Sequence, residues 1–261
     1  MSKVQTSTFT DSALSDKVKE FLTRFKDKSG NYKYVEEIDE MMPRNTKYIV
    51  VDYNDLVFQP EIGNLFSQSP DRIFDAFSRA IKEALQTRFP DYAEKIKDEV
   101  RVRLINYPLQ RSLRQINAET IGTITSVSGM VVRASEVKPL AKELVFVCPD
   151  DHPTKVIQLK GMDVKMPVVC DNPNCKHRDF DLKPEASKFI DFQLLRLQEL
   201  PEDLPPGQLP HYIDVAIRQD LVNNARPGDR IILTGIVRIE QESVSGVQRG
   251  HSVLYRLRIE G

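Results

Sequence analysis

The spacing of the hydrophobic residues changes near residue 99, and this change constrains the fold more than any other feature of the sequence. Before it, apolar residues recur every three or four positions, as on the buried stripe of an amphipathic helix. After it, they alternate in runs rich in β-branched residues, with glycine, proline and asparagine between the runs, as in strands and turns. We therefore predict a multidomain α+β chain in which a helical domain precedes a β domain.

The first 97 residues are expected to form a small helical bundle. Leu14, Val18 and Phe21 share one stripe of the first helix, for which Asp11 or Ser12 is the predicted N-cap. The second helix should end before Pro43, since the residue preceding a proline disfavours helical geometry. The predicted elements are helices at 13–26, about 32–42, 70–89 and 91–98, and a short strand at 47–53.

The remainder of the chain is expected to form a small barrel. Five or more strands, glycines inside the long ones and no helical stretch between them favour a five-stranded OB-fold. The predicted strands are 100–107, 121–134, 143–148, 187–200, 212–217, 229–240 and 252–260. We assign residues 98–145 and 184–261 to the barrel, with a hairpin at about 238–258 and an inserted zinc-binding subdomain at 146–183.

All three cysteines of the chain lie between positions 148 and 175, and a histidine follows closely after the first of them. Cys148-x3-His152 and Cys170-x4-Cys175 are two pairs of residues with metal-ligand spacing. Thiolate and imidazole are ligands that zinc prefers, and two tight turns can supply two corners of a tetrahedron each. Four protein ligands leave no open coordination position, so we predict a structural zinc site.

Two alternatives to this zinc site stay open. His177 could replace His152 as the fourth ligand, although it lies close to Cys175 for one tetrahedron. The simpler alternative is a set of unrelated buried thiols beside a surface histidine. A catalytic zinc site of a hydrolase or deaminase is disfavoured, because no H-x-E motif occurs. The chain also lacks a G-x-x-x-x-G-K-[ST] loop and a Ser–His–Asp signature, so no catalytic residue is predicted.

A site for a polyanion has to come from the position of charges, because the formal net charge is −1. Arg133, Lys138 and Arg196 could border one groove of the barrel, where OB-folds bind single strands. Arg238 and Arg249 lie on the predicted hairpin, with Arg249 at its tip. Scattered surface charge and a solubilising hairpin are the simpler alternatives. No aromatic residue is interleaved with these cations, so contacts to the phosphate backbone would dominate.

The N-terminal residues MSKVQTSTFT lack the apolar core of a signal peptide, and no run is long enough to span a membrane. Three cysteines, an odd number at low density, argue against a disulfide framework. We expect an intracellular protein, located in the cytoplasm.

Several segments of the C-terminal part together resemble one family. LQELPEDLPPGQLP (197–210), DLVNNARPGD (220–229) and RIILTGIVRIE (230–240), after a helical domain and a barrel interrupted by a zinc knuckle, resemble the N-terminal half of an archaeal minichromosome maintenance (MCM) helicase. The resemblance covers nearly the whole chain, and positions 1–95 carry little of it. It implies a homo-hexameric ring around single- or double-stranded DNA, formed singly or as a double hexamer, which works with other replication proteins at the archaeal nucleoid. It also implies an ATPase domain after residue 261, which would bring ATP and Mg.

The resemblance also implies roles for particular residues. Arg133, Lys138 and Arg196 fall where the family's single-strand-binding motif has basic residues. Arg249 falls at the tip of the N-terminal hairpin, where Gln248 replaces a second basic residue. The segment 197–210 matches the loop that relays between the two rings, and the zinc knuckle matches the one between head-to-head hexamers. Because His211 also replaces a common arginine, we expect weaker electrostatic affinity for DNA than in a typical relative.

A different class of function stays open. The zinc knuckle could dock a protein, with the barrel serving as a scaffold that does not bind DNA. Oligomeric state and affinity for single-stranded DNA separate these two hypotheses.

Overall fold

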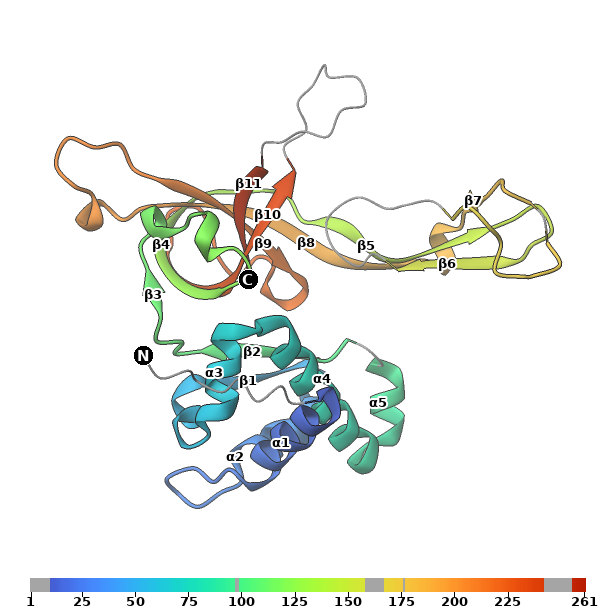
Figure 1. The fold of residues 1–261 in the computed structure, drawn as a ribbon, viewed down its shortest axis with the longest axis horizontal. Coiled ribbons are helices and arrows are strands. Elements are labelled where there is room, and N and C mark those ends of the chain that lie inside the picture. Colours follow the sequence, from blue (N-terminus) through green and yellow to red (C-terminus); the bar gives the residue numbers. More distant parts are fainter. Residues whose placement is uncertain (1–9, 97–98, 158–166, 176, 242–254) are drawn as a thin grey trace. The chain divides into compact units, whose positions relative to one another are not determined.

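The computed structural model describes residues 10–96, 99–157, 167–175, 177–241 and 255–261 (Figure 1). The chain divides into two compact units. The first unit comprises residues 1–111, 120–127 and 234–236, and the second comprises residues 112–119, 128–233 and 237–261. This division into a mainly helical unit and a β unit agrees with the change of period in the sequence.

The first unit is built from five helices whose apolar stripes face one another. Phe21, Tyr34, Phe66 and Phe77 are almost fully buried and form the centre of the core. The rings of Phe21 and Phe77 meet edge to face with centroids 6.3 Å apart, a favourable arrangement of two aromatic quadrupoles. The helices are α1 (Asp11–Arg24), α2 (Lys33–Arg44), α3 (Pro60–Gln68), α4 (Pro70–Arg88) and α5 (Pro90–Ile96).

The helices differ from the predictions in three places. Thr10, not Asp11 or Ser12, caps α1, since its Oγ1 accepts a hydrogen bond from the N–H of Ala13 at 3.4 Å. Helix α2 continues through Pro43 for one residue before Asn45 ends it in a left-handed conformation (φ 50°). The proline falls in the last turn, so its missing N–H costs a single bond. Helix α3 was not predicted.

The strand predicted at 100–107 belongs to the helical unit, not to the barrel. Strand β2 (Arg101–Ile105) pairs in parallel with β1 (Tyr48–Asp52), with Val51 opposite Leu104. Both strands bury alternate residues, among them Ile49, Val51, Val102 and Leu104, in the core of this unit. Their apolar alternation identified strands correctly, but not the sheet that each would join.

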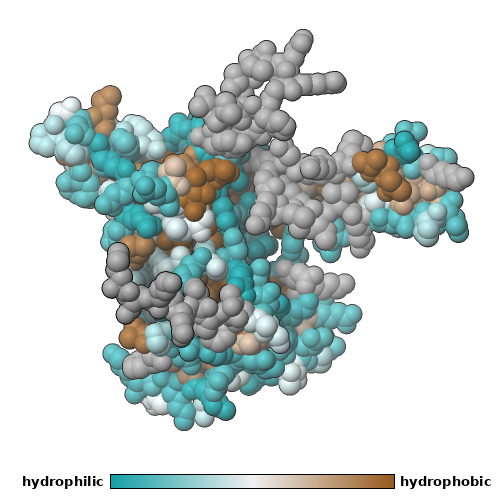
Figure 2. All heavy atoms as spheres, in the orientation of Figure 1, coloured by the Kyte–Doolittle hydropathy of each residue, from teal (hydrophilic) through white to brown (hydrophobic). Residues whose placement is uncertain are grey.

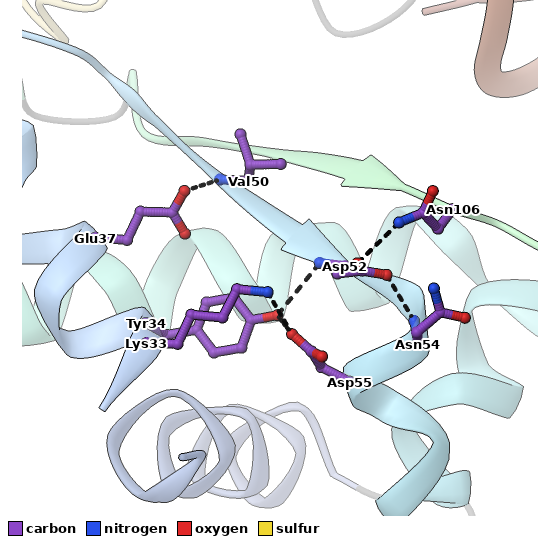
Figure 3. Close-up of polar contacts among 8 residues, drawn as sticks. All are labelled: Lys33, Tyr34, Glu37, Val50, Asp52, Asn54, Asp55 and Asn106. Atoms are coloured by element: carbon purple, nitrogen blue, oxygen red, sulfur yellow. Dashed lines mark hydrogen bonds and ion pairs between the residues drawn. The ribbon is translucent and has the colours of Figure 1, made fainter. Parts of the chain in front are cut away.

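A partly buried polar network lies beside this small sheet (Figure 3). The hydroxyl of the buried Tyr34 donates to Asp55 Oδ2 at 2.6 Å and accepts from the N–H of Asp52 at 3.2 Å. The ammonium group of Lys33 lies 2.7 Å from the same Asp55 oxygen. Burial and the hydrogen bond to Asp55 raise the pKa of Tyr34, so the phenol stays protonated and holds α2 to the chain that follows β1.

A nine-stranded mixed sheet forms most of the β-rich part of the chain. Neighbouring strands pair in the order β3-β4-β10-β11-β9-β8-β5-β6, and β7 pairs with β5. Because β4 also pairs with β8, the strands β4, β10, β11, β9 and β8 form a closed circuit. The nine strands of the sheet are β3 (Gln110–Arg111), β4 (Ile124–Ala134), β5 (Lys138–Val147), β6 (Pro153–Ile157), β7 (Asp181–Leu182), β8 (Lys188–Gln198), β9 (Tyr212–Arg218), β10 (Arg230–Gln241) and β11 (Tyr255–Glu260).

One face of this circuit is apolar and fully enclosed. Val131, Leu195, Leu197, Val215 and Ile259 lie there, each with no exposed surface. Gly129 lets β4 approach β8 closely, because a Cβ at this position would lie 2.9 Å from the carbonyl oxygen of Gln198. Glycine at this position therefore permits the pairing that closes the circuit.

Strands β5, β6 and β7 run away from the closed circuit as an extended finger (Figure 1). Figure 2 shows an apolar patch on this finger. Val168, Val169 and Leu182 are exposed apolar residues of the finger. No helix among the described residues is both long and apolar enough to cross a bilayer.

Candidate metal centre and nucleic-acid interface

Two turns bring the three cysteines and His152 together on the finger. The first turn connects β5 to β6, where Asp151 adopts a positive φ of 60° and its N–H donates to the carbonyl of Cys148 at 2.9 Å. In the second turn the N–H of Cys175 donates to the carbonyl of Asn172 at 3.0 Å. Asn172 Oδ1 also accepts from the N–H of Asn174 at 3.1 Å, so this turn is held by its own side chain.

The four ligand atoms have the spacing of a tetrahedral metal site. Cys148 Sγ lies 3.7 Å from Cys175 Sγ, 4.0 Å from Cys170 Sγ and 3.5 Å from His152 Nδ1. All four ligand atoms lie within 4.8 Å of one another. Zinc–sulfur bonds of about 2.3 Å and zinc–nitrogen bonds of about 2.0 Å at tetrahedral angles imply separations near 3.8 Å for S···S and 3.5 Å for S···N. The donor set therefore fits a zinc ion.

The surroundings of these atoms also suit a metal. All three cysteines are free thiols and buried. Burial disfavours the thiolate of Cys148, but N–H groups of His152 and Asp150 lower its pKa to about 7. The N–H of His177 favours the thiolate of Cys175, yet burial and the other two cysteines raise its pKa to about 11. Three thiolates at this separation need a cation to neutralise them.

The structure brings His152, not His177, to the three sulfur atoms. His152 turns Nδ1 toward them, while the side-chain amide of Asn172 lies 2.9 Å from its Nε2 and fixes the ring orientation. His177 instead groups with Asp150 and Cys175, and its Nε2 lies 3.2 Å from Asp150 Oδ2. Asp150 and His177 are both exposed, unlike the cysteines.

Of the residues predicted to contact DNA, Arg133 and Arg196 are direct neighbours. Arg133 on β4 lies opposite Arg196 on β8 in the antiparallel register. Lys138 begins β5 and lies opposite Phe192, further along the same strand β8. Arg133 and Lys138 are exposed, and within the described part of the chain neither forms an ion pair. The three predicted cations thus share the neighbourhood of one strand.

The other predicted cations differ in their surroundings. Arg238 is partly buried and its Nε lies 3.2 Å from Glu260 Oε2. Arg196 donates from Nε and Nη2 to the two oxygens of Asp214 at 2.7 and 3.0 Å, and this pairing raises its pKa. Gln248 and Arg249 lie outside the described residues.

Sequence reasoning did not identify the anchor of the segment 197–210. Arg114 donates from Nε to both oxygens of the buried Glu199, at 2.8 and 3.0 Å. Its Nη2 donates to the carbonyl of Leu209 at 3.0 Å, and its Nη1 donates to Gln208. Because Arg114 is distant in the sequence from all three partners, no local pattern could have indicated these contacts.

Comparison with known proteins shows the family of the chain. Residues 15–106 match the MCM N-terminal domain, and residues 112–241 match the MCM OB domain. The chain belongs to the minichromosome maintenance family. This confirms the resemblance drawn from segments 197–240 and assigns the OB domain to the β-rich part of this MCM chain.

The relatives of this MCM chain come from archaea and eukaryotes. A minichromosome maintenance protein of Saccharolobus solfataricus is 31% identical over 245 residues, covering 90% of this chain and 35% of the relative. DNA replication licensing factor MCM4 of Drosophila melanogaster is 28% identical over 262 residues, covering 95% of this chain and 30% of the relative. DNA replication licensing factor MCM6 of Oryza sativa is 31% identical over 230 residues, covering 84% and 28%. The chain thus spans about a third of the length of these relatives.

Proposed function

We propose that this chain is the DNA-binding, ring-forming N-terminal region of a replicative MCM helicase, acting as a hexamer that encircles DNA. The proposal depends mainly on one observation: Arg133, Lys138 and Arg196 lie on or directly beside strand β8 of the OB domain. Two of these cations are exposed and have no carboxylate partner in the described part of the chain. OB domains bind single strands along such surfaces.

The binding would be mainly electrostatic. Exposed guanidinium and ammonium groups contact phosphate oxygens without reading sequence. A net charge of −1 gives the whole chain no general attraction to DNA, so affinity has to arise where cations are concentrated. Arg249, Gln248 and Arg238 on the hairpin at about 238–258 would add contacts in an assembled ring.

The first test is a titration of single-stranded DNA with the double variant Arg133→Ala/Lys138→Ala. We expect weaker binding and a slope of log K against log salt that is shallower by about 0.7 for each phosphate that the variant no longer neutralises. A matched control is Arg230→Ala/Lys188→Ala, which removes the same charge at side chains that pair with Glu202 and Glu143. Equally weakened binding in both variants, or an unchanged slope in the first, would show that Arg133 and Lys138 do not contact phosphate.

We also propose that residues 146–183 form a zinc-binding subdomain inserted in the OB domain, with zinc held by Cys148, His152, Cys170 and Cys175. The zinc would be structural, since four protein ligands close its coordination. Elemental analysis should return one zinc per chain, lost in His152→Ala and retained in His177→Ala. If His152→Ala retained its zinc and His177→Ala lost it, His177 and not His152 would be the fourth ligand.

The full protein would add functions that this chain does not carry alone. By family, an ATPase domain binding ATP and Mg would drive unwinding, and the segment 197–210 would relay between the rings. The same proposal includes assembly as single or double hexamers. In a double hexamer the zinc subdomain would lie between the two rings. It also includes contacts to other replication proteins. The proposed location is the nucleoid in the cytoplasm of an archaeon.

One observation favours a second function for the finger. Val168 and Val169 are 72% and 66% exposed beside the candidate zinc ligand Cys170. Apolar side chains this exposed suit a protein contact, as in the scaffold hypothesis. Wild-type protein that stays monomeric and does not bind single-stranded DNA at low salt would favour that hypothesis over the DNA-binding one.

A further inference from the structure

The pairing of β4, β8 and β9 aligns charged residues from three strands. Arg133 lies opposite Arg196, and Arg196 lies opposite Asp214 on β9. Directly opposed residues of antiparallel strands point to the same face of a sheet. Arg196 alternates along β8 with Leu195 and Leu197, which are fully buried, so this row lies on the face away from the apolar core.

A bulge places Arg133 in this row. The pairing of β4 with β8 shifts register between Val131 and Arg133, so that one residue of β4 has no partner. Without the shift, Arg133 would share the inward face with Val131, which is fully buried. The register shift therefore places the side chain of Arg133 on the outward face, the same face as Arg196.

Asp214 lies beneath two arginines. Its oxygens accept from Nε and Nη2 of Arg196 at 2.7 and 3.0 Å, and Nη1 of Arg256 on β11 lies 3.7 Å from its Oδ2. The carboxylate is only 11% exposed, whereas the side chains of Arg196 and Arg256 are 42% and 54% exposed. Arg258, directly opposite Asp214, is buried and pairs with Glu240, so it does not occupy this position.

The carboxylate of Asp214 reduces the repulsion between the neighbouring arginine side chains. Guanidinium groups on adjacent strands repel one another, and like charges opposite each other destabilise a sheet. One buried carboxylate offsets that repulsion while its two guanidinium partners stay at the surface. Within this group of four residues, Arg133, Arg196 and Arg256 against Asp214 leave a surplus of two positive charges. Arg196 uses its Nε–Nη2 edge for Asp214, so the N–H groups of Nη1 are directed elsewhere.

We propose that Asp214 is a positioning residue that holds Arg196 and Arg256 beside Arg133 as one site for consecutive phosphates of a single strand. The inference rests on the proposed function, and it adds Arg256 and Asp214 to the DNA-binding surface. Asp214 does not touch the DNA. It acts by fixing guanidinium planes before binding, so that less rotational freedom is lost when a phosphate is bound.

The test compares Asp214→Asn with Glu202→Gln in titrations of oligothymidylate, using the whole chain. Each variant removes one negative charge at similar side-chain volume, and Glu202 pairs with Arg230, outside this row. If net charge alone set the affinity, both variants would bind the DNA more tightly than the wild-type protein. Positioning predicts that Asp214→Asn binds about tenfold more weakly despite its added positive charge, the scale of one charge-assisted hydrogen bond. Its salt slope should fall by about 0.7.

Arg196→Lys provides a second measurement that does not depend on the fold tolerating Asn at position 214. Lysine keeps the charge but cannot make the two-pronged contact with Asp214, so binding should also weaken. Unchanged or tighter binding by Asp214→Asn, or full affinity in Arg196→Lys, would overturn the inference. Wild-type protein that fails to bind oligothymidylate at low salt would instead overturn the proposed function itself.

Discussion

At the scale of single residues, Glu199 is a buried carboxylate that depends on Arg114. The hydrogen bond and charge of Arg114 lower the pKa of Glu199 below its ordinary value of 4.5, against the cost of burial. A lowered folded-state pKa means that the pair stabilises the fold fully above the unfolded pKa and loses that effect as pH falls through the lowered value. The dependence on pH therefore lies in the acid range, below about 4.5.

Arg114→Ala should destabilise the second unit by roughly 3 kcal/mol, because it leaves a buried charge without its partner. Urea unfolding at pH 7 measures the change in the free energy of unfolding. At a pH low enough to protonate Glu199, the difference between variant and wild type should shrink. An equal difference at both pH values would mean that packing of the arginine, not its charge, stabilises the fold.

Tyr34→Phe tests the partly buried polar network of the helical unit. The change removes a hydroxyl that donates to Asp55 and accepts from the N–H of Asp52. We expect a decrease of about 1–2 kcal/mol in the free energy of unfolding, the range for a hydrogen bond to a charged group. Phe21→Leu is a comparison in the same core that changes packing but removes no hydrogen bond.

At the scale of elements, the closed circuit depends on the approach of β4 to β8 at Gly129. Gly129→Ala should cost about 1–3 kcal/mol, because its Cβ would crowd a backbone carbonyl that has little freedom to move. Gly129→Val should cost more, since its branched side chain adds further crowding. Thermal melting of both variants measures the order. Equal stability of all three proteins would show that the two strands separate without cost.

The finger is expected to respond to metal removal as a local element. Beyond the circuit its strands are held by the pairings of β5 with β6 and β7, so the chelated protein should lose order there first. Limited proteolysis after chelation should cut near residues 148–182, while circular dichroism of the rest changes little. Chelation of the Cys170→Ser variant should not increase its proteolysis beyond that of the same variant without chelator. Global unfolding on chelation would contradict a local role.

At the scale of the whole molecule, the proposed function links DNA affinity to assembly of the ring. A site with two surplus charges is weak alone, and several copies in one ring raise the effective concentration of sites along a strand. Light scattering should therefore give a mass near six times the 29.9 kDa of the chain. DNA affinity should fall on dilution below the assembly threshold. A monomer with full affinity would show that assembly is not needed for binding.

Much of the organisation was predictable, because it depends on local periodicity. The helical character of the first part of the sequence predicted α1, α2, α4 and α5, and the clustered cysteines predicted the ligand set that the finger brings together. The predictions that were wrong concern pairing between segments far apart in the sequence. Strand β2 pairs with β1 across the helices between them, and nothing in its own alternation distinguishes that partner from a strand of the barrel.

By itself, the sequence determined the helical and β parts, the spacing of the candidate zinc ligands and the family, since each is written in short stretches of chain. Which charges lie together follows from the fold and not from any short stretch of sequence. The register of β4, β8, β9 and β11 places Asp214 against Arg196 and Arg256, and the turn at Asp151 brings His152 to the sulfur atoms. The reason is physical: Coulomb and hydrogen-bond energies depend on distances between atoms, and strand pairing sets those distances for residues far apart in the chain.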